Sequence, residues 1–191
     1  MESDDACFEM GRRDGARIPD LTRREVLVAG ATALASLAWV PPAFAADEGF
    51  RVSEATRAAL GESSLLYVSP LHKNGSESSC HGEVWYFVDG DAVVIATAAD
   101  RWKVRAIRSG RDRARVWVGD HGPVWRAGKR YRDAPSFLAR AEIDDDKAVF
   151  ERLMQAFAER YADEWSKWKP RFDKGYADGS RLVVRYTPIE E

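Results

Sequence analysis

Basic side chains gather directly after a strongly β-prone run, and their chemistry is that of anion binding. Residues 92–97 form the run, and Arg101, Lys103 and Arg105 follow within a few positions. A phosphate group needs cationic side chains and free backbone N–H groups that converge on it, and a strand end leading into a helix start supplies both. Alternatively, Lys103, Arg105 and Arg108 are the solvated face of a short helix, and spacing alone favours that interpretation.

The histidines and cysteines do not have the spacing of a metal site. His72, His81 and His121 are far apart, and Cys80 has no second cysteine near it. Protein metal sites of the zinc type place ligands in closely spaced pairs. The sequence therefore predicts no metal site. It also offers no obvious general acid or base, so no catalytic residue is assigned.

The elements that would position the basic cluster are mainly antiparallel strands. Residues 84–88 and 92–97 are two β-rich runs joined by Asp89-Gly90-Asp91. Asp-Gly between such runs is typical of a hairpin, because it tolerates the positive φ of a tight connection. Alternating or β-rich patterns predict further strands at residues 65–69, 113–119, 137–143 and 181–187.

Helices are predicted around these strands. Ser53 caps a short helix that ends near Gly61, and residues 102–108 form one or two helical turns. The acidic residues 144–146 cap a long amphipathic helix, which extends to about Trp168 before Pro170. The prediction is a mainly β, α+β fold: a small barrel of about six antiparallel strands, one long helix and one or two short ones.

Residues 1–45 have the organisation of a cleaved export signal. Arg23-Arg24 abuts the apolar residues 26–40, and the small-x-small pattern of residues 43–45 predicts cleavage after Ala45. The apolar stretch is shorter than the ~20 residues that span a bilayer. The paired arginines and the mild hydrophobicity favour the twin-arginine (Tat) route. We therefore expect the Tat translocase as a transient partner, a periplasmic or extracellular protein, and no stable membrane insertion.

The mature chain is electrically balanced. Loss of the signal removes five arginines and seven acidic residues, which leaves 24 basic and 24 acidic residues. This balance gives no support to nucleic-acid binding or to binding of an anionic membrane. The remaining length suits one domain. We expect an N-terminal segment at residues 46–64 with the short helix, followed by the barrel domain at residues 65–191.

The mature chain resembles the pyridoxamine 5′-phosphate oxidase-like superfamily, the flavin-binding split barrels, over residues 65–188. Three stretches carry the resemblance in their order and spacing. Residues 81–91 resemble the first hairpin, residues 97–107 the phosphate-binding turn, and residues 137–143 the later strand that leads into a helix. The resemblance implies a split β-barrel that forms a homodimer.

The resemblance also implies a cofactor site. Flavin-binding members place a Thr at the strand end and a Lys six positions later, and Thr97 and Lys103 keep that spacing. The implied phosphate ligands are Thr97 and Lys103 with Arg101 and Arg105, while Trp102 would pack beside the isoalloxazine ring. Relatives often carry a small hydroxyl residue at the position of Arg101 and a basic one at that of Trp102.

The function implied is that of an exported flavin-dependent oxidoreductase with FMN, or deazaflavin F420, acting on a small molecule of unknown identity. Residues 83–88 lack the basic residues that pyridoxamine-phosphate oxidases carry on the first hairpin strand, which argues against that particular activity. Haem is a weaker alternative, since some split barrels bind it. A non-catalytic split barrel that binds flavin, F420 or haem remains open, as does a ligand-free interaction protein.

Overall fold

The computed structural model describes residues 51–190, so the predicted export signal lies outside the described residues. Within that part, the strands form one antiparallel seven-stranded sheet in the order β2-β1-β5-β6-β7-β4-β3. No helix among residues 51–190 is long and apolar enough to cross a membrane. The strands are β1 (Leu66–Pro70), β2 (Gly82–Val84), β3 (Phe87–Asp89), β4 (Ala92–Ala98), β5 (Arg113–Val118), β6 (Ser136–Asp144) and β7 (Arg181–Ile189).

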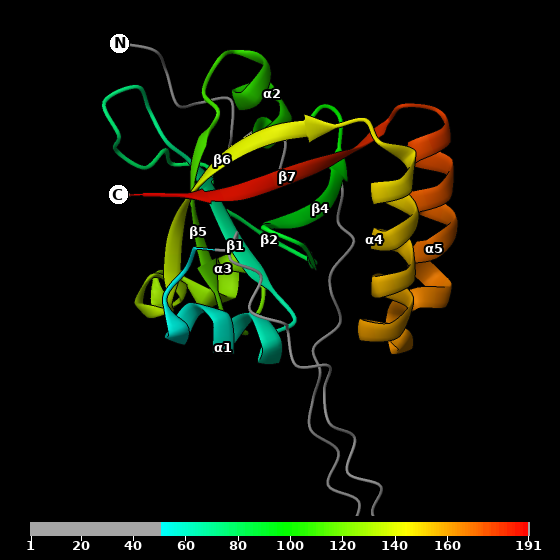
Figure 1. Ribbon diagram of the computed structural model, residues 1–191, viewed down its shortest axis with the longest axis horizontal. Coiled ribbons are helices and arrows are strands. Elements are labelled where there is room, and N and C mark those ends of the chain that lie inside the picture. Colours follow the sequence, from blue (N-terminus) through cyan, green and yellow to red (C-terminus); the bar gives the residue numbers. More distant parts are fainter. Residues whose placement is uncertain (1–50, 191) are drawn as a thin grey trace, which may run out of the picture.

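The two edge strands of this sheet are consecutive in the chain. β2 pairs with β1 and β3 pairs with β4, yet only Trp85 and Tyr86 separate the two strands. The sheet must therefore curl until its edges meet, and the curled sheet is visible in Figure 1. The predicted α+β split-barrel fold is confirmed. The prediction of a single strand over residues 84–88 is wrong, because the chain leaves one edge at Val84 and joins the other at Phe87.

The inner face of the curled sheet encloses the main core. Helix α1 (Glu54–Glu62) contributes Leu60 to this core, and α2 (Trp102–Arg108) contributes Val104. In Figure 1, α1 lies below the sheet and α2 above it, so each helix covers one end of the barrel. Both helices were predicted, and the Ser53 cap is confirmed because its Oγ accepts from the Thr56 N–H at 3.1 Å.

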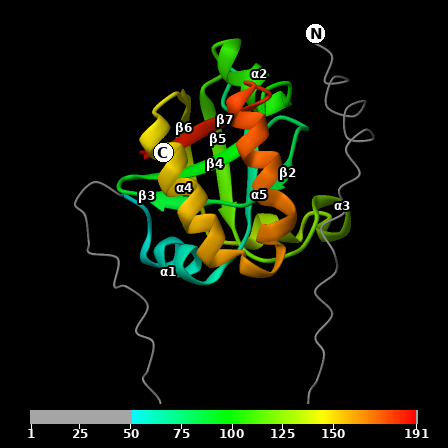
Figure 2. The same cartoon turned by 90° about the vertical axis from the view of Figure 1, so that its right-hand side faces the viewer.

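Two helices cover the outer face of β4 and β7, as Figure 2 shows. They are α4 (Lys147–Arg160) and α5 (Ala162–Ala177), and Phe150 of the first stacks on Tyr176 of the second at 3.7 Å between ring centroids. The prediction of one helix ending before Pro170 is wrong: the chain reverses at Tyr161, and Pro170 lies inside α5. A proline in a helix costs ~3 kcal/mol. Packing of Phe172 on the first helix offsets that cost.

The segment between β5 and β6 folds onto the outer side of β1 and β5. It contains α3 (Val124–Ala127) and the 3-10 helix η2 (Arg130–Asp133). Tyr131 stacks on Tyr67 with 4.6 Å between ring centroids, and both are buried with Trp117 in a small aromatic cluster. Trp125, in the same segment, is 74% exposed.

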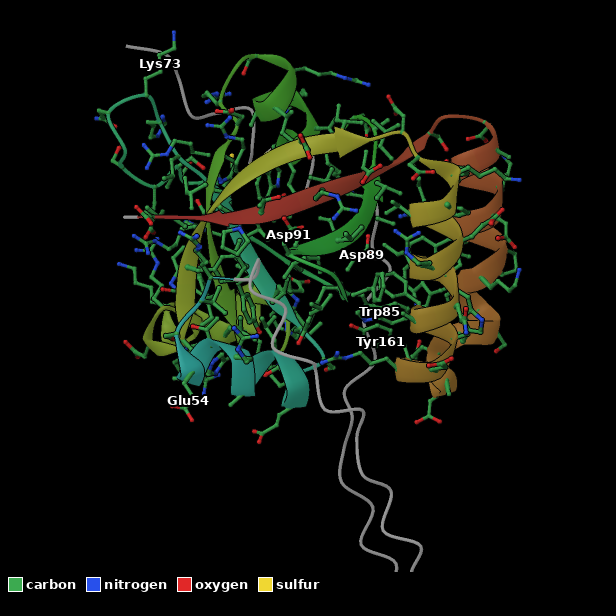
Figure 3. All side chains as sticks on the ribbon, in the orientation of Figure 1. Glu54, Lys73, Trp85, Asp89, Asp91 and Tyr161 are labelled. Atoms are coloured by element: carbon green, nitrogen blue, oxygen red, sulfur yellow. The ribbon has the colours of Figure 1, made fainter. Side chains whose placement is uncertain are left out.

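The reversal at Tyr161 is bonded directly to the crossing between the edge strands. Trp85 stacks on the Tyr161 ring, with 4.2 Å between centroids and 3° between planes, and the two side chains lie together in Figure 3. The Tyr161 hydroxyl accepts from the Tyr86 N–H at 3.0 Å and donates to the Ser64 carbonyl at 2.9 Å. Arg160 donates to the Tyr86 hydroxyl at 2.8 Å. The α4–α5 pair therefore fixes the position at which the barrel closes.

Replacing Tyr161 with phenylalanine tests this connection. The variant keeps the ring stack but leaves the buried Tyr86 N–H without its acceptor, so the free energy of unfolding should fall by ~1–3 kcal/mol. Urea denaturation measures the change. Tyr176→Phe, a tyrosine that stacks on the other end of the helix pair, is the matched control. Equal stabilities of the two variants would show that the hydroxyl at the crossing does not hold the barrel closed.

Candidate functional site

The strand-to-helix junction expected to hold an anion is formed by β4 and α2. β4 ends at Ala98, and the Arg101 N–H donates to the Ala98 carbonyl at 3.1 Å. Arg101 then caps α2 in an extended conformation (φ −71°, ψ 151°) without a side-chain capping bond. Val104 is fully buried in the main core, which fixes the rotation of the helix about its axis. That rotation decides where Lys103 lies.

Lys103 does not lie on a solvated helix face. Its side chain is only 7% exposed, and Nζ lies 4.2 Å from the centroid of the Trp102 ring, within range of a cation–π contact. Within residues 51–190, no hydrogen bond or ion pair reaches the Lys103 amine. Arg108, one helical turn further on, is exposed. The solvated-face interpretation therefore fits Arg108 and does not fit Lys103.

The start of β2 passes directly against the Lys103 amine. A Cβ atom at Gly82 would lie 3.3 Å from Lys103 Nζ and 3.3 Å from Trp102 Cζ2. A side chain at this position would require the Lys103 amine or the Trp102 ring to shift by a few tenths of an ångström. Sequence reasoning missed Gly82, although a glycine inside a strand is the usual sign of such an approach. Gly82, Trp102 and Lys103 together form the centre of the candidate site.

The electrostatics of this centre favour an anion. Burial lowers the pKa of the Lys103 amine to about 8; the charge of Arg101 also lowers this pKa, and Glu83 raises it. Glu83 is already engaged, because its Oε2 accepts from the Val124 N–H at 3.0 Å at the start of α3. An anion bound beside Lys103 would compensate the buried charge.

The other predicted ligands are Thr97 of β4 and Arg105 of α2. Thr97 is 6% exposed and pairs with Leu182 of β7; it lies on the same strand face as Val93 and Ile95 of the main core. Arg105 is half-buried on α2. Within the described residues, no hydrogen bond or ring contact joins Lys103 to Thr97 or Arg105. Their roles as cofactor ligands stay predictions.

His81, just before Gly82, has an unusual environment. Its Nε2 accepts from Arg132 Nη2 at 3.3 Å, because a guanidinium can only donate, so the neutral ring carries its proton on Nδ1. That Nδ1 is buried and has no hydrogen-bond partner. Burial lowers the pKa of His81, and the Arg132 charge lowers it further. Among residues 51–190, no group of three or more His, Cys, Asp or Glu side chains is arranged to hold a metal ion.

Solved structures with this fold include a conserved hypothetical protein from Mycobacterium tuberculosis. Its TM-score is 0.50 at 22% sequence identity, over 74% of this chain and 84% of that one. The haem storage protein HutZ from Vibrio cholerae matches with a TM-score of 0.47 and 11% identity, over 74% and 93% of the two chains. A candidate pyridoxamine 5′-phosphate oxidase from Listeria innocua matches with 0.46 and 14%, over 70% and 90%.

Two of the structural neighbours, from Listeria innocua and Lactobacillus delbrueckii, are described as candidate pyridoxamine 5′-phosphate oxidases. No family profile and no curated protein sequence matches the chain. Likeness at these identities shows the fold. The function has to be argued from the site.

The buried charge of Lys103 should make stability depend on pH. The pKa of about 8 in the folded state lies below the usual 10.5, so the charged amine destabilises the fold below pH 8. Between about pH 8 and pH 10.5 the folded state releases its proton before the unfolded state does, and this penalty disappears. Lys103→Met should therefore be more stable than the wild type at pH 7, by on the order of 1–3 kcal/mol, and should gain less on moving to pH 10.

Urea denaturation at pH 7 and pH 10 measures this difference. Lys147→Met, which removes an exposed lysine from α4, is the control for the loss of one charge. If Lys103→Met and Lys147→Met respond to pH alike, the Lys103 amine is not desolvated in the folded protein.

Proposed function

We propose that this chain is a flavin-dependent oxidoreductase of the split-barrel type, exported by the Tat route and active outside the cytoplasm. The observation that carries the proposal is the buried Lys103 amine, which lies against Gly82 and Trp102 and makes no hydrogen bond or ion pair among residues 51–190. The phosphate of FMN, or the anionic tail of F420, has the charge that this environment needs. The residues present therefore fit the group.

The residues of the site have separate tasks in this proposal. Lys103 holds the phosphate by charge and hydrogen bonding. Arg101, whose charge lowers the pKa of Lys103, adds a second cation for the same anion. The Trp102 ring keeps the amine in place through its π face. Thr97 and Arg105 complete the predicted ligand set. The flavin, when bound, supplies hydride or electron transfer.

Assembly and export belong to the same proposal. The split-barrel resemblance supports a homodimer, with sites at the subunit interface. The twin arginines of residues 23–24 support export in the folded state, which would let the cofactor be loaded before the protein leaves the cytoplasm. The substrate is a small molecule whose identity the site does not specify.

A second candidate is a split barrel that binds flavin, F420 or haem without catalysis. The state of Glu83 favours it: this carboxylate, whose charge acts on Lys103, is engaged at the start of α3 and so is not free to act as a base. A ligand-free interaction protein is the third reading. It would leave the buried amine without a function.

The spectrum of the protein separates these candidates. The exported form should be purified from its native host, because a foreign host can lack F420. A yellow protein with a band near about 450 nm is expected, whereas a strong band near about 400 nm would indicate haem. A colourless protein that binds neither added FMN nor added F420 would overturn the proposal.

The phosphate role of Lys103 predicts a ligand-dependent effect of its loss. Lys103→Met should weaken FMN binding about 10- to 100-fold, because a charge-assisted hydrogen bond is lost. It should leave the affinity for riboflavin, which lacks the phosphate, almost unchanged. Fluorescence titration of the apoprotein measures both affinities.

The exposed Arg108 provides the matched control for this measurement, since Arg108→Met removes one charge from the same helix. An equal loss of FMN affinity in the two variants would show that Lys103 acts only through long-range charge and does not contact the phosphate. Equal losses of FMN and riboflavin affinity in Lys103→Met would point to a disturbed fold and not to a phosphate contact.

A further inference from the structure

Two arginines face each other on the outside of the barrel. Arg113 of β5 and Arg140 of β6 are directly opposite partners in the strand register. Their chain neighbours Ala114 and Ala139 are also partners and belong to the inner core. Because side chains alternate between the two faces of a sheet, the arginines point outward together.

The hydrogen-bond pattern brings these two side chains especially close. The Ala141 N–H donates to the Asp112 carbonyl at 2.6 Å, one residue outside the pair on each strand. That pattern makes Arg113 and Arg140 a non-hydrogen-bonded pair, the narrow kind in which side chains approach most closely. Like charges directly opposite each other in such a pair destabilise a sheet.

No nearby acid relieves this repulsion. Both side chains are exposed, and within residues 51–190 neither makes a hydrogen bond or an ion pair. Glu142 lies two positions along β6 on the same face but forms no ion pair with either arginine in that part of the chain. The guanidinium of its own cross-strand partner, Arg185, is bound by Asp89 and Asp144.

We propose that Arg113 and Arg140 form a binding site for a tetrahedral oxyanion, the phosphate or sulfate group of a ligand. Two guanidinium groups on neighbouring strands offer several N–H donors to one group, and a dianion matches their combined charge. Thr187 of β7 is the cross-strand partner of Arg140 on its other side and adds a hydroxyl to the same face. The site is independent of the proposed function, because it uses none of the residues around Lys103.

The test is a titration of the 15N-labelled protein with inorganic phosphate, and separately with sulfate, at constant ionic strength. It is made in the Lys103→Met background, so that binding at the inner site cannot contribute. Saturable shifts of the Arg113 and Arg140 amide signals are expected with both anions. Arg140→Gln should weaken the affinity about tenfold or more. Arg113→Gln should have little further effect once Arg140 is gone, because both act on one anion.

Two comparisons make the outcome decisive. Arg171→Gln, which removes an exposed arginine from α5, should leave the affinity unchanged. Acetate should bind more weakly than phosphate. Non-saturating shifts, equal responses to acetate and phosphate, or equal losses in Arg171→Gln and Arg140→Gln would each overturn the site, because they describe two solvated arginines that only screen charge.

Discussion

The structure depends on the crossing at Trp85 and Tyr86. One continuous stretch of chain supplies both edge strands of the sheet, and two residues are all that separate β2 from β3. A flat sheet cannot satisfy this connection, so closure of the barrel is imposed by covalent geometry. Between the two strands, the backbone N–H and C=O groups of the crossing have no neighbouring strand to pair with. Tyr161 supplies the missing acceptor for the Tyr86 N–H, and Arg160 anchors the Tyr86 hydroxyl.

Closure also explains why a lysine can be buried at the candidate site. The chain that enters the crossing begins at Gly82, and this start of β2 meets the first turn of α2. α2 cannot rotate to expose Lys103 without withdrawing Val104 from the main core. The fold thus retains an unfavourable charge in a fixed place. An unfavourable buried charge is common at binding sites, because the opposite charge of the ligand compensates it.

Features set by neighbouring residues were predictable from the sequence, and features set by distant residues were not. The Asp89-Gly90-Asp91 hairpin was found because its turn chemistry is local, and Gly90 has the positive φ (61°) that such a turn needs. The breaks at Trp85–Tyr86 and at Tyr161 were missed, because each depends on the other across the structure. At the site, the Thr97–Lys103 spacing could be read from the sequence. The burial of Lys103 could not, since it depends on the close approach of a separate strand that begins at Gly82.

The position of β7 has a consequence for the order in which this protein can form. β7 lies inside the sheet, between β6 and β4, and its pairing with β4 joins Val93 to Tyr186. A ribosome-bound chain that lacks this strand has the β3–β4 hairpin with an open edge, a state that invites pairing with other chains. The barrel can therefore close only after β7 has been synthesised. Loss of β7 would divide the sheet at its middle. Loss of an edge strand, β2 or β3, would leave the rest of the sheet in one piece.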